Sequence, residues 1–128
     1  MSIRVILASA SPRRRELLAL ALDEFDILPA DIEENLPEGL ELTQGPAYLA
    51  AQKARFLADQ HPDALVIGCD TGVFIDGQML GKPKDAEQAQ SMLEELSGRV
   101  HQVITGCCLC LEGREHIFQE ETWAVSYT

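Results

Sequence analysis

An anion-binding turn is predicted near the start of the chain, where the segment from Ser9 to Arg15 follows a short apolar run at 5–8. Ser11 is a favourable N-cap and Pro12 a favourable first helical residue, so free backbone N–H groups and the positive end of a helix should face the turn. Three consecutive arginines add bidentate donors suited to a phosphate or a carboxylate. The same residues also fit a plain capped helix with solvated arginines, and the turn alone does not decide between the two.

Acidic residues are predicted to follow two strands of a sheet. Asp70 is the first charged residue after the continuously apolar run at 64–69, and Glu33 and Glu34 come shortly after a predicted strand at 25–30. The carboxyl ends of parallel strands meet at one edge of a sheet. We therefore expect Asp70 and one of the two glutamates to share a crevice with the arginine-bearing turn.

Two carboxylates beside an anion-binding turn favour the hydrolysis of a polyphosphate. Carboxylates hold Mg²⁺, which prefers oxygen ligands and offsets the charge on bridging phosphate oxygens. A carboxylate within hydrogen-bond reach can also orient or deprotonate the attacking water. For Asp70 the alternative is a structural turn cap beside Thr71 and Gly72, which the spacing alone leaves open.

Two lysines are candidate phosphate ligands. Lys82 lies between Gly81 and Pro83, so its side chain leaves a stiff backbone. Lys53 lies in a predicted helix at 46–60. Most lysines stay in water, so an exposed loop lysine at 82 and a solvated helix face at 53 are the alternatives.

The elements that must position these residues alternate between strands and helices. Strands are predicted at 4–8, 25–30, 64–69 and 100–111, with a small hairpin at 73–80 and a last strand in which Trp123, Val125 and Tyr127 alternate. Helices are predicted at 12–22, 46–60 and 85–96. This order indicates an α/β fold.

Length and composition indicate one globular domain. The 128 residues are 46% hydrophobic, enough for a sizeable core. No apolar run could span a bilayer, and the arginine cluster follows the first apolar stretch, the reverse of a secretory signal, so we expect a cytoplasmic protein with no membrane contact. The four cysteines fit that compartment as reduced core residues better than as a structural metal site.

The net charge of −11 argues against a nucleic-acid-binding protein, because non-specific affinity for nucleic acid comes from many lysines and arginines. Only ten basic residues are present. Several of them cluster around three predicted turns, at 13–15, 53–55 and 82–84. An acidic chain that concentrates its cations in this way is suited to one small, highly charged anion.

Five motifs together resemble the Maf family, the septum formation inhibitor proteins. They are Leu7-Ala8-Ser9-Ala10-Ser11-Pro12-Arg13-Arg14, Gln52-Lys53-Ala54, Gly68-Cys69-Asp70-Thr71, Leu80-Gly81-Lys82-Pro83 and Leu96-Ser97-Gly98-Arg99-Val100-His101. The resemblance implies a nucleoside triphosphate pyrophosphatase that uses a divalent metal, Mg²⁺ or Mn²⁺. It also implies the α/β fold shared with the inosine triphosphate pyrophosphatases, a mixed twisted sheet with flanking helices.

Residue roles follow from the same resemblance. Asp70 is implied as the general base or metal-linked carboxylate, with Glu34 as its metal partner. Ser9 is implied to lie in the phosphate turn. Thr71, beside the base, matches the subgroup that acts on dTTP and UTP. Phosphate contacts are implied for three basic residues: Arg13, Lys53 and Lys82.

The resemblance also sets expectations about completeness. Cys69 and Gly72 stand where the family usually has alanine and a branched apolar residue. Family members continue beyond residue 128 with a segment that carries a specificity-linked glutamine, so residues 1–128 are expected to be a single Maf-like domain truncated at its C-terminus. A non-catalytic nucleotide-binding or division-regulating protein, and a fragment without a ligand, are the alternatives. The exposed edge of an unfinished sheet favours a homodimer.

Overall fold

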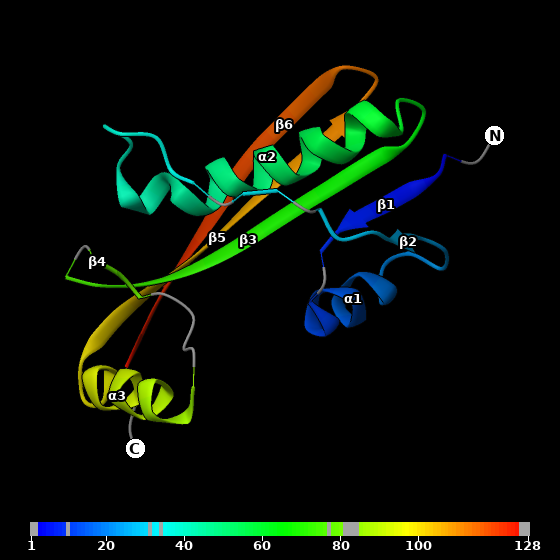
Figure 1. Cartoon of the computed structure of the whole chain (residues 1–128). Helices are drawn as coiled ribbons and strands as arrows, with labels where there is room; N and C mark the ends of the chain where they lie inside the picture. Colours follow the sequence, from blue (N-terminus) through cyan, green and yellow to red (C-terminus); the bar gives the residue numbers. More distant parts are fainter. Residues whose placement is uncertain are drawn as a thin grey trace.

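The computed structural model of the chain describes residues 3–9, 11–30, 32–33, 35–76, 78–80 and 85–125. Strands and helices alternate as the sequence predicts (Figure 1). The elements in chain order are β1 (Val5–Ala8), α1 (Pro12–Ala19), β2 (Asp26–Ile27), the short 3₁₀ helix η1 (Leu42–Gln44), α2 (Gly45–Gln60), β3 (Leu65–Ile75), β4 (Gln78–Leu80), α3 (Ala86–Leu96), β5 (Val100–Leu111) and β6 (Arg114–Val125).

The strands form one mixed sheet in the order β2-β1-β3-β5-β6, with β4 paired to β3. The pairs β1–β2 and β1–β3 are parallel, whereas β3–β5, β5–β6 and β3–β4 are antiparallel. The predicted α/β class with a mixed sheet and flanking helices is therefore confirmed. No helix within the described ranges has both the length and the apolar character needed to cross a bilayer.

Helix α2 covers one face of the sheet and forms the main core with it (Figure 1). Its small side chains, among them Ala50 and Ala54, pack on buried residues of three strands, such as Ile6, Val66 and Cys108. Small residues on the helix let its backbone come close to the strands, and close packing of this kind supplies most of the hydrophobic stabilisation.

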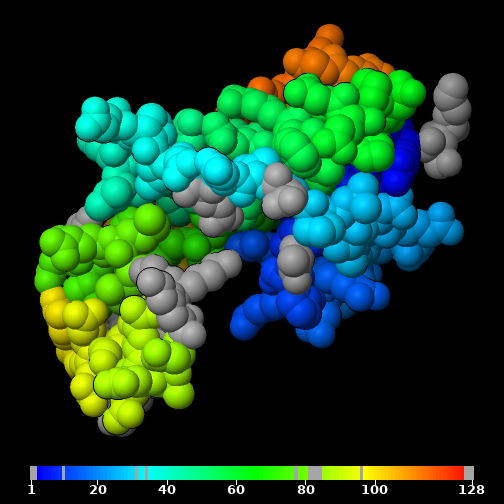
Figure 2. Space-filling model, viewed as in Figure 1, coloured from blue at the N-terminus to red at the C-terminus, as the bar shows by residue number. Residues whose placement is uncertain are grey.

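Helix α1 lies on the opposite side of the sheet and has no buried residue. Its Leu17 remains exposed, as does Leu20 directly after the helix. Little packing therefore supports further turns, which explains why α1 ends at Ala19 although the sequence predicted a helix through residue 22. Figure 2 shows α1, in blue, and α3, in yellow-green, standing apart on the lower side of the molecule.

Two other boundaries differ from the predictions. Strand β2 has two residues rather than the expected 25–30, and one further backbone bond from Leu28 N to Leu7 O continues its alignment with β1. Strand β6 extends far beyond the alternating residues that predicted it, because it pairs with β5 along its whole length from Arg114 to Val125. The predicted hairpin and α3 are confirmed, and Asp85 caps α3 by accepting a hydrogen bond from Gln88 N at 2.8 Å.

Candidate active site

Strand β3 has an open stretch along one edge. On that side β1 pairs with it only as far as Gly68, and β4 begins to pair only at Val73, so within the described part of the chain residues 69–72 face neither strand. On its other side the same stretch is paired continuously to β5. Side chains from both faces of the sheet can therefore reach the space beside this gap.

Asp70 lies inside this open stretch, in the middle of β3. The prediction that Asp70 follows the end of a strand is therefore wrong. The polar and glycine residues after Cys69 resemble a turn in the sequence, but antiparallel pairing with β5 carries the strand through to Ile75. The strand that ends near Asp70 is β1. Its last pairing with β3 is at Gly68, two positions before Asp70.

Asp70 pairs with Lys53 of α2, whose Nζ lies 3.0 Å from Asp70 Oδ1. The two side chains are only 18% and 15% exposed, so Lys53 is not on a solvated helix face. Partial burial strengthens such a pair relative to a surface ion pair. The arrangement gives the open stretch a carboxylate and a cation in contact.

Glycines bring α2 close enough for this pair to form. A Cβ on Gly68 would lie 2.3 Å from Ala50 O, and a Cβ on Gly106, which is directly opposite Asp70, would lie 2.3 Å from Ala47 N. Only glycine fits where the helix backbone approaches the strands so closely. These two positions therefore set the distance between α2 and the sheet at Asp70.

Arg14 reaches the same stretch from the other face. Its Nη2 donates to Thr71 Oγ1 at 2.7 Å and its Nη1 donates to the carbonyl oxygen of Cys69 at 3.4 Å. Thr71 Oγ1 also lies 3.1 Å from Thr105 Oγ1 of β5. Arg14 thus ties the weakly packed helix α1 to β3, directly beside Asp70.

The turn before α1 has the predicted cap. Ser11 Oγ accepts a hydrogen bond from Arg14 N at 3.4 Å, and Pro12 occupies the first turn. Ser9 is buried, and its Oγ accepts a hydrogen bond from Ser11 N at 3.1 Å. The described contact of the Ser9 hydroxyl is therefore within the turn. Ser11 instead lines a cavity between this turn and β3.

A cavity of about 860 Å³ contains most of the predicted site. Its polar lining includes Arg13, Arg14, Lys53, Asp70, Thr71 and Thr105. Its apolar lining comes from α1 and from side chains of β1, β3 and β5 such as Leu7, Ile67 and Val103. An anionic group with an attached apolar or aromatic part matches a cavity lined in this way.

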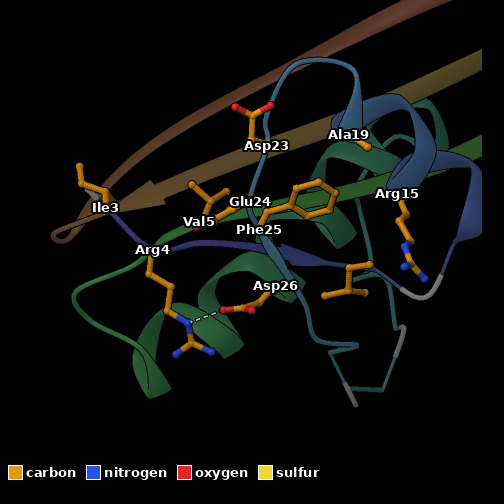
Figure 3. Close-up of a pocket in the computed structure, with 10 residues that line it drawn as sticks. Ile3, Arg4, Val5, Arg15, Ala19, Asp23, Glu24, Phe25 and Asp26 are labelled. Atoms are coloured by element: carbon orange, nitrogen blue, oxygen red, sulfur yellow. Dashed lines mark hydrogen bonds and ion pairs between the residues drawn. The ribbon is translucent and has the colours of Figure 1, made fainter. Parts of the chain in front are cut away.

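A second cavity, of about 750 Å³, lies at the outer edge of the sheet between β1, β2 and α1 (Figure 3). Arg4 pairs there with Asp26, and Arg15 lies at its border. None of the predicted site residues within the described ranges lines this cavity. The three consecutive arginines thus face two different cavities. Arg13 and Arg14 line the first cavity, and Arg15 lines the second.

Two predicted site residues, Glu34 and Lys82, lie outside the described residues. Glu33 is described, and its Oε2 accepts a hydrogen bond from Asn35 Nδ2 at 3.2 Å. Among the described residues that line the first cavity, Asp70 is the sole carboxylate. One carboxylate fits Mg²⁺ when substrate phosphates and waters supply the other oxygen ligands.

The sequence interpretation missed Arg14, Thr105 and Cys107. Arg14 was visible in the arginine cluster, but only the helix orientation shows which guanidinium faces β3. Thr105 and Cys107 are brought to the site by the β3–β5 register, in which they stand opposite Thr71 and Cys69. Strand alternation on β5 could have predicted their shared face, though not their partners.

The Cys69 and Cys107 sulfurs lie 3.5 Å apart beside Asp70. A hydrogen bond from the Cys107 thiol, with smaller contributions from Arg14 and Lys53, lowers the pKa of Cys69 to about 7 against the effect of burial. The pKa of Cys107 is raised by the same hydrogen bond and by burial. Proton sharing between the two thiols thus favours the Cys69 thiolate.

A second cysteine pair lies on the α2 face. Cys108 Sγ and Cys110 Sγ are 3.7 Å apart, and within the described ranges a carboxylate oxygen of Glu115 lies within 4.8 Å of both sulfurs. Both carboxylate oxygens of Glu115 accept from Arg55 Nε, at 2.8 and 2.9 Å. The guanidinium thus neutralises this carboxylate.

Comparisons with known proteins identify a family and related sequences. A family model described as Maf-like protein matches residues 4–127. A dTTP/UTP pyrophosphatase of Ruminiclostridium cellulolyticum is 47% identical over 96% of the chain, and one of Bacillus pumilus is 45% identical over 98%. The chain spans 65% and 66% of the lengths of these two relatives.

The fold has a counterpart among solved structures. A HAM1 protein from Coxiella burnetii matches with a TM-score of 0.68 at 21% identity. The match covers 97% of this chain and 73% of that protein. At this identity the likeness concerns the fold alone.

Proposed function

The chain belongs to the Maf-like protein family, and from this premise we propose that it is a nucleoside triphosphate pyrophosphatase acting on dTTP and UTP. The products are the nucleoside monophosphate and pyrophosphate. The observation that carries the proposal is the ion pair of Asp70 and Lys53 in the open stretch of β3, with Arg14 beside it.

Positive charge from two helices that border the cavity supports the binding of a triphosphate. Lys53 comes from α2, and Arg13 and Arg14 come from the first turn of α1. Guanidinium groups bind phosphate oxygens with paired donors, and the N-terminus of α1 adds its partial positive charge. The sequence adds Lys82 and Ser9 as further proposed phosphate contacts.

Asp70 is proposed as the group that orients and deprotonates the attacking water. Lys53 contacts Oδ1, and within the described ranges no hydrogen bond engages Oδ2, so that oxygen can accept a proton from water. Asp70 and, by the family resemblance, Glu34 would hold a divalent cation. Such a cation would offset the negative charge of the phosphates when bound.

Thr71 is proposed to help distinguish pyrimidine nucleotides, as the family resemblance implies. Its hydroxyl is held by Arg14 and Thr105 at the wall of the cavity. Because these two contacts fix the hydroxyl, it presents its remaining hydrogen-bonding capacity in one direction, which can favour one base over another.

The test is pyrophosphate release from dTTP and UTP with Mg²⁺ or Mn²⁺, compared with ATP and GTP. We expect release of pyrophosphate and monophosphate from the pyrimidine nucleotides. Asp70→Asn should lower the rate by at least about a hundredfold while circular dichroism stays unchanged. Asp26→Asn is the matched control, because Asp26 also pairs with a basic side chain but lies outside this cavity.

Two results would contradict the proposal. One is an equal rate in wild type and Asp70→Asn. The other is a folded chain that binds UTP but releases no pyrophosphate under any of these conditions, which would favour the non-catalytic nucleotide-binding alternative.

A further inference from the structure

We infer that Cys69 and Cys107 form a peroxide-sensitive dithiol, which a hydroperoxide converts to a disulfide at the wall of the first cavity. The inference concerns a modification site and does not depend on the proposed enzymatic activity. It is carried by the position of the two cysteines in the sheet, by the distance between their sulfurs and by their access to the cavity.

The two cysteines are direct cross-strand neighbours. Cys69 of β3 and Cys107 of β5 occupy paired positions in the antiparallel register. Residues opposite each other in such pairs have Cα atoms about 4.5 to 5.5 Å apart, inside the range that disulfides accept. Their sulfurs are already 3.5 Å apart, so bond formation needs only a small movement of the two side chains.

A small oxidant can reach this pair. Both residues are half-buried, and Cys69 lines the cavity of about 860 Å³. The pair lies beside the residues that Arg14 contacts, Thr71 and the carbonyl group of Cys69 itself. A disulfide here would therefore alter the wall of the cavity and leave the core under α2 unchanged.

The other cysteine pair lacks these properties. Cys108 and Cys110 are two residues apart on one extended strand, which places their Cα atoms about 6.6 Å apart, near the upper limit for a disulfide. Both are buried in the core beneath α2. They provide an internal comparison for oxidation within the same chain.

The reaction balances with one hydroperoxide for each pair. One thiolate attacks a peroxide oxygen, the O–O bond breaks, and sulfenic acid and hydroxide form. The second thiolate then attacks the sulfenic sulfur, the S–O bond breaks and hydroxide leaves. The two thiol protons end on the two hydroxides, so two thiols and H₂O₂ yield one disulfide and two waters.

The experiment treats the native, reduced chain with a small excess of hydrogen peroxide, quenches with an alkylating reagent and measures the intact mass. After allowance for the added alkyl groups, we expect a loss of about 2 Da, and two of the four thiols should no longer react with the alkylating reagent. Dithiothreitol should reverse both changes. Trypsin places Cys69 in peptide 56–84 and the other three cysteines in peptide 100–114. The disulfide should therefore join these two peptides.

Two variants locate the bond. Cys107→Ala should abolish the cross-linked peptides, and Cys110→Ala, the matched control, should form them at the wild-type rate. The inference is overturned if the native chain forms no cross-link between the two peptides, if Cys107→Ala forms it as fast as wild type, or if the disulfide forms within peptide 100–114. Circular dichroism before oxidation checks that each variant is folded.

Discussion

The two faces of the sheet at β3 and β5 are built from alternating residues of the same strands, yet they differ in packing and polarity. The face under α2 presents Gly68, Gly106 and the buried Cys108, with the helix backbone in close approach. The face toward α1 presents two threonines and Cys69, which line a cavity, together with the half-buried Cys107. The packing of α2 fills the first face, whereas the second face borders a cavity that is open to a ligand.

Asp70 is the exception that connects the two faces. By alternation it belongs to the α2 face, where Lys53 holds it. Because β1 ends at the register position of Gly68, Asp70 still reaches the cavity on the other side. The comparison thus predicts that substitutions under α2 affect stability, that those toward α1 affect ligand binding, and that those at the ion pair affect catalysis.

The largest effect is expected from Gly106→Ala. Its Cβ would lie 2.3 Å from Ala47 N, so α2 would have to move away from the sheet. Overpacking against backbone should lower the free energy of unfolding by about 3 kcal/mol or more, measured by urea denaturation. Thr105→Ala, on the preceding position and the opposite face, should cost less than about 1 kcal/mol. Equal losses would refute the difference between the faces.

The next effect is expected from Lys53→Met. Loss of the cation beside Asp70 should lower kcat/KM for UTP roughly ten- to a hundredfold, because a charge-assisted contact of this kind contributes about 1.5 to 3 kcal/mol. Arg55→Met is the matched control, since Arg55 lies on the same helix but pairs with Glu115 outside the cavity. Steady-state kinetics should show no more than a small change for it. A similar loss in both variants would point to a general effect on α2.

A smaller effect on activity is expected from Arg14→Ala. The substitution removes the bonds to Thr71 and to the carbonyl group of Cys69, and with them the attachment of α1 beside the site. KM for UTP should rise by about tenfold, with little change in the unfolding midpoint, because α1 buries no side chain. Arg15→Ala should leave KM unchanged. The reverse result would assign the phosphate to the second cavity.

The smallest effect is expected from the exposed pair of Arg55 and Glu115. The hydrogen bond from Arg55 lowers the pKa of Glu115 below its usual 4.5. Its stabilisation is thus present above pH 4.5 and is lost as the pH falls through the lowered pKa. Arg55→Met should reduce stability at pH 7 by at most about 1 kcal/mol, and the difference should vanish in acid. Denaturation at several pH values would show a constant difference if this assignment were wrong.

Much of the fold could be predicted from the sequence because hydrophobic patterns and caps are local. The strand in the apolar run at 64–69, the cap at Asp85 and the end of α2 after Gln60 are examples. The continuation of β3 through Asp70 could not be predicted, because it depends on pairing with β5, more than thirty residues away in the chain.

The candidate site was predictable to a similar degree. The motifs identified Asp70, Lys53 and Arg13 by residue type and spacing, and these three residues line one cavity. The contact between Lys53 and Asp70 depends on the close approach of α2 over Gly68 and Gly106, and local periodicity does not reveal it. The roles of Glu34 and Lys82 stay predictions from the sequence.

The central claim is that the open stretch of β3 binds the nucleotide, and backbone amide NMR with a UTP analogue tests it most directly. The analogue carries an imido group between its α- and β-phosphates, so it binds without being cleaved. We predict that the largest shift changes occur at 69–72 and in the first turn of α1. Shifts concentrated instead around Arg4 and Asp26, in the second cavity, would contradict the account.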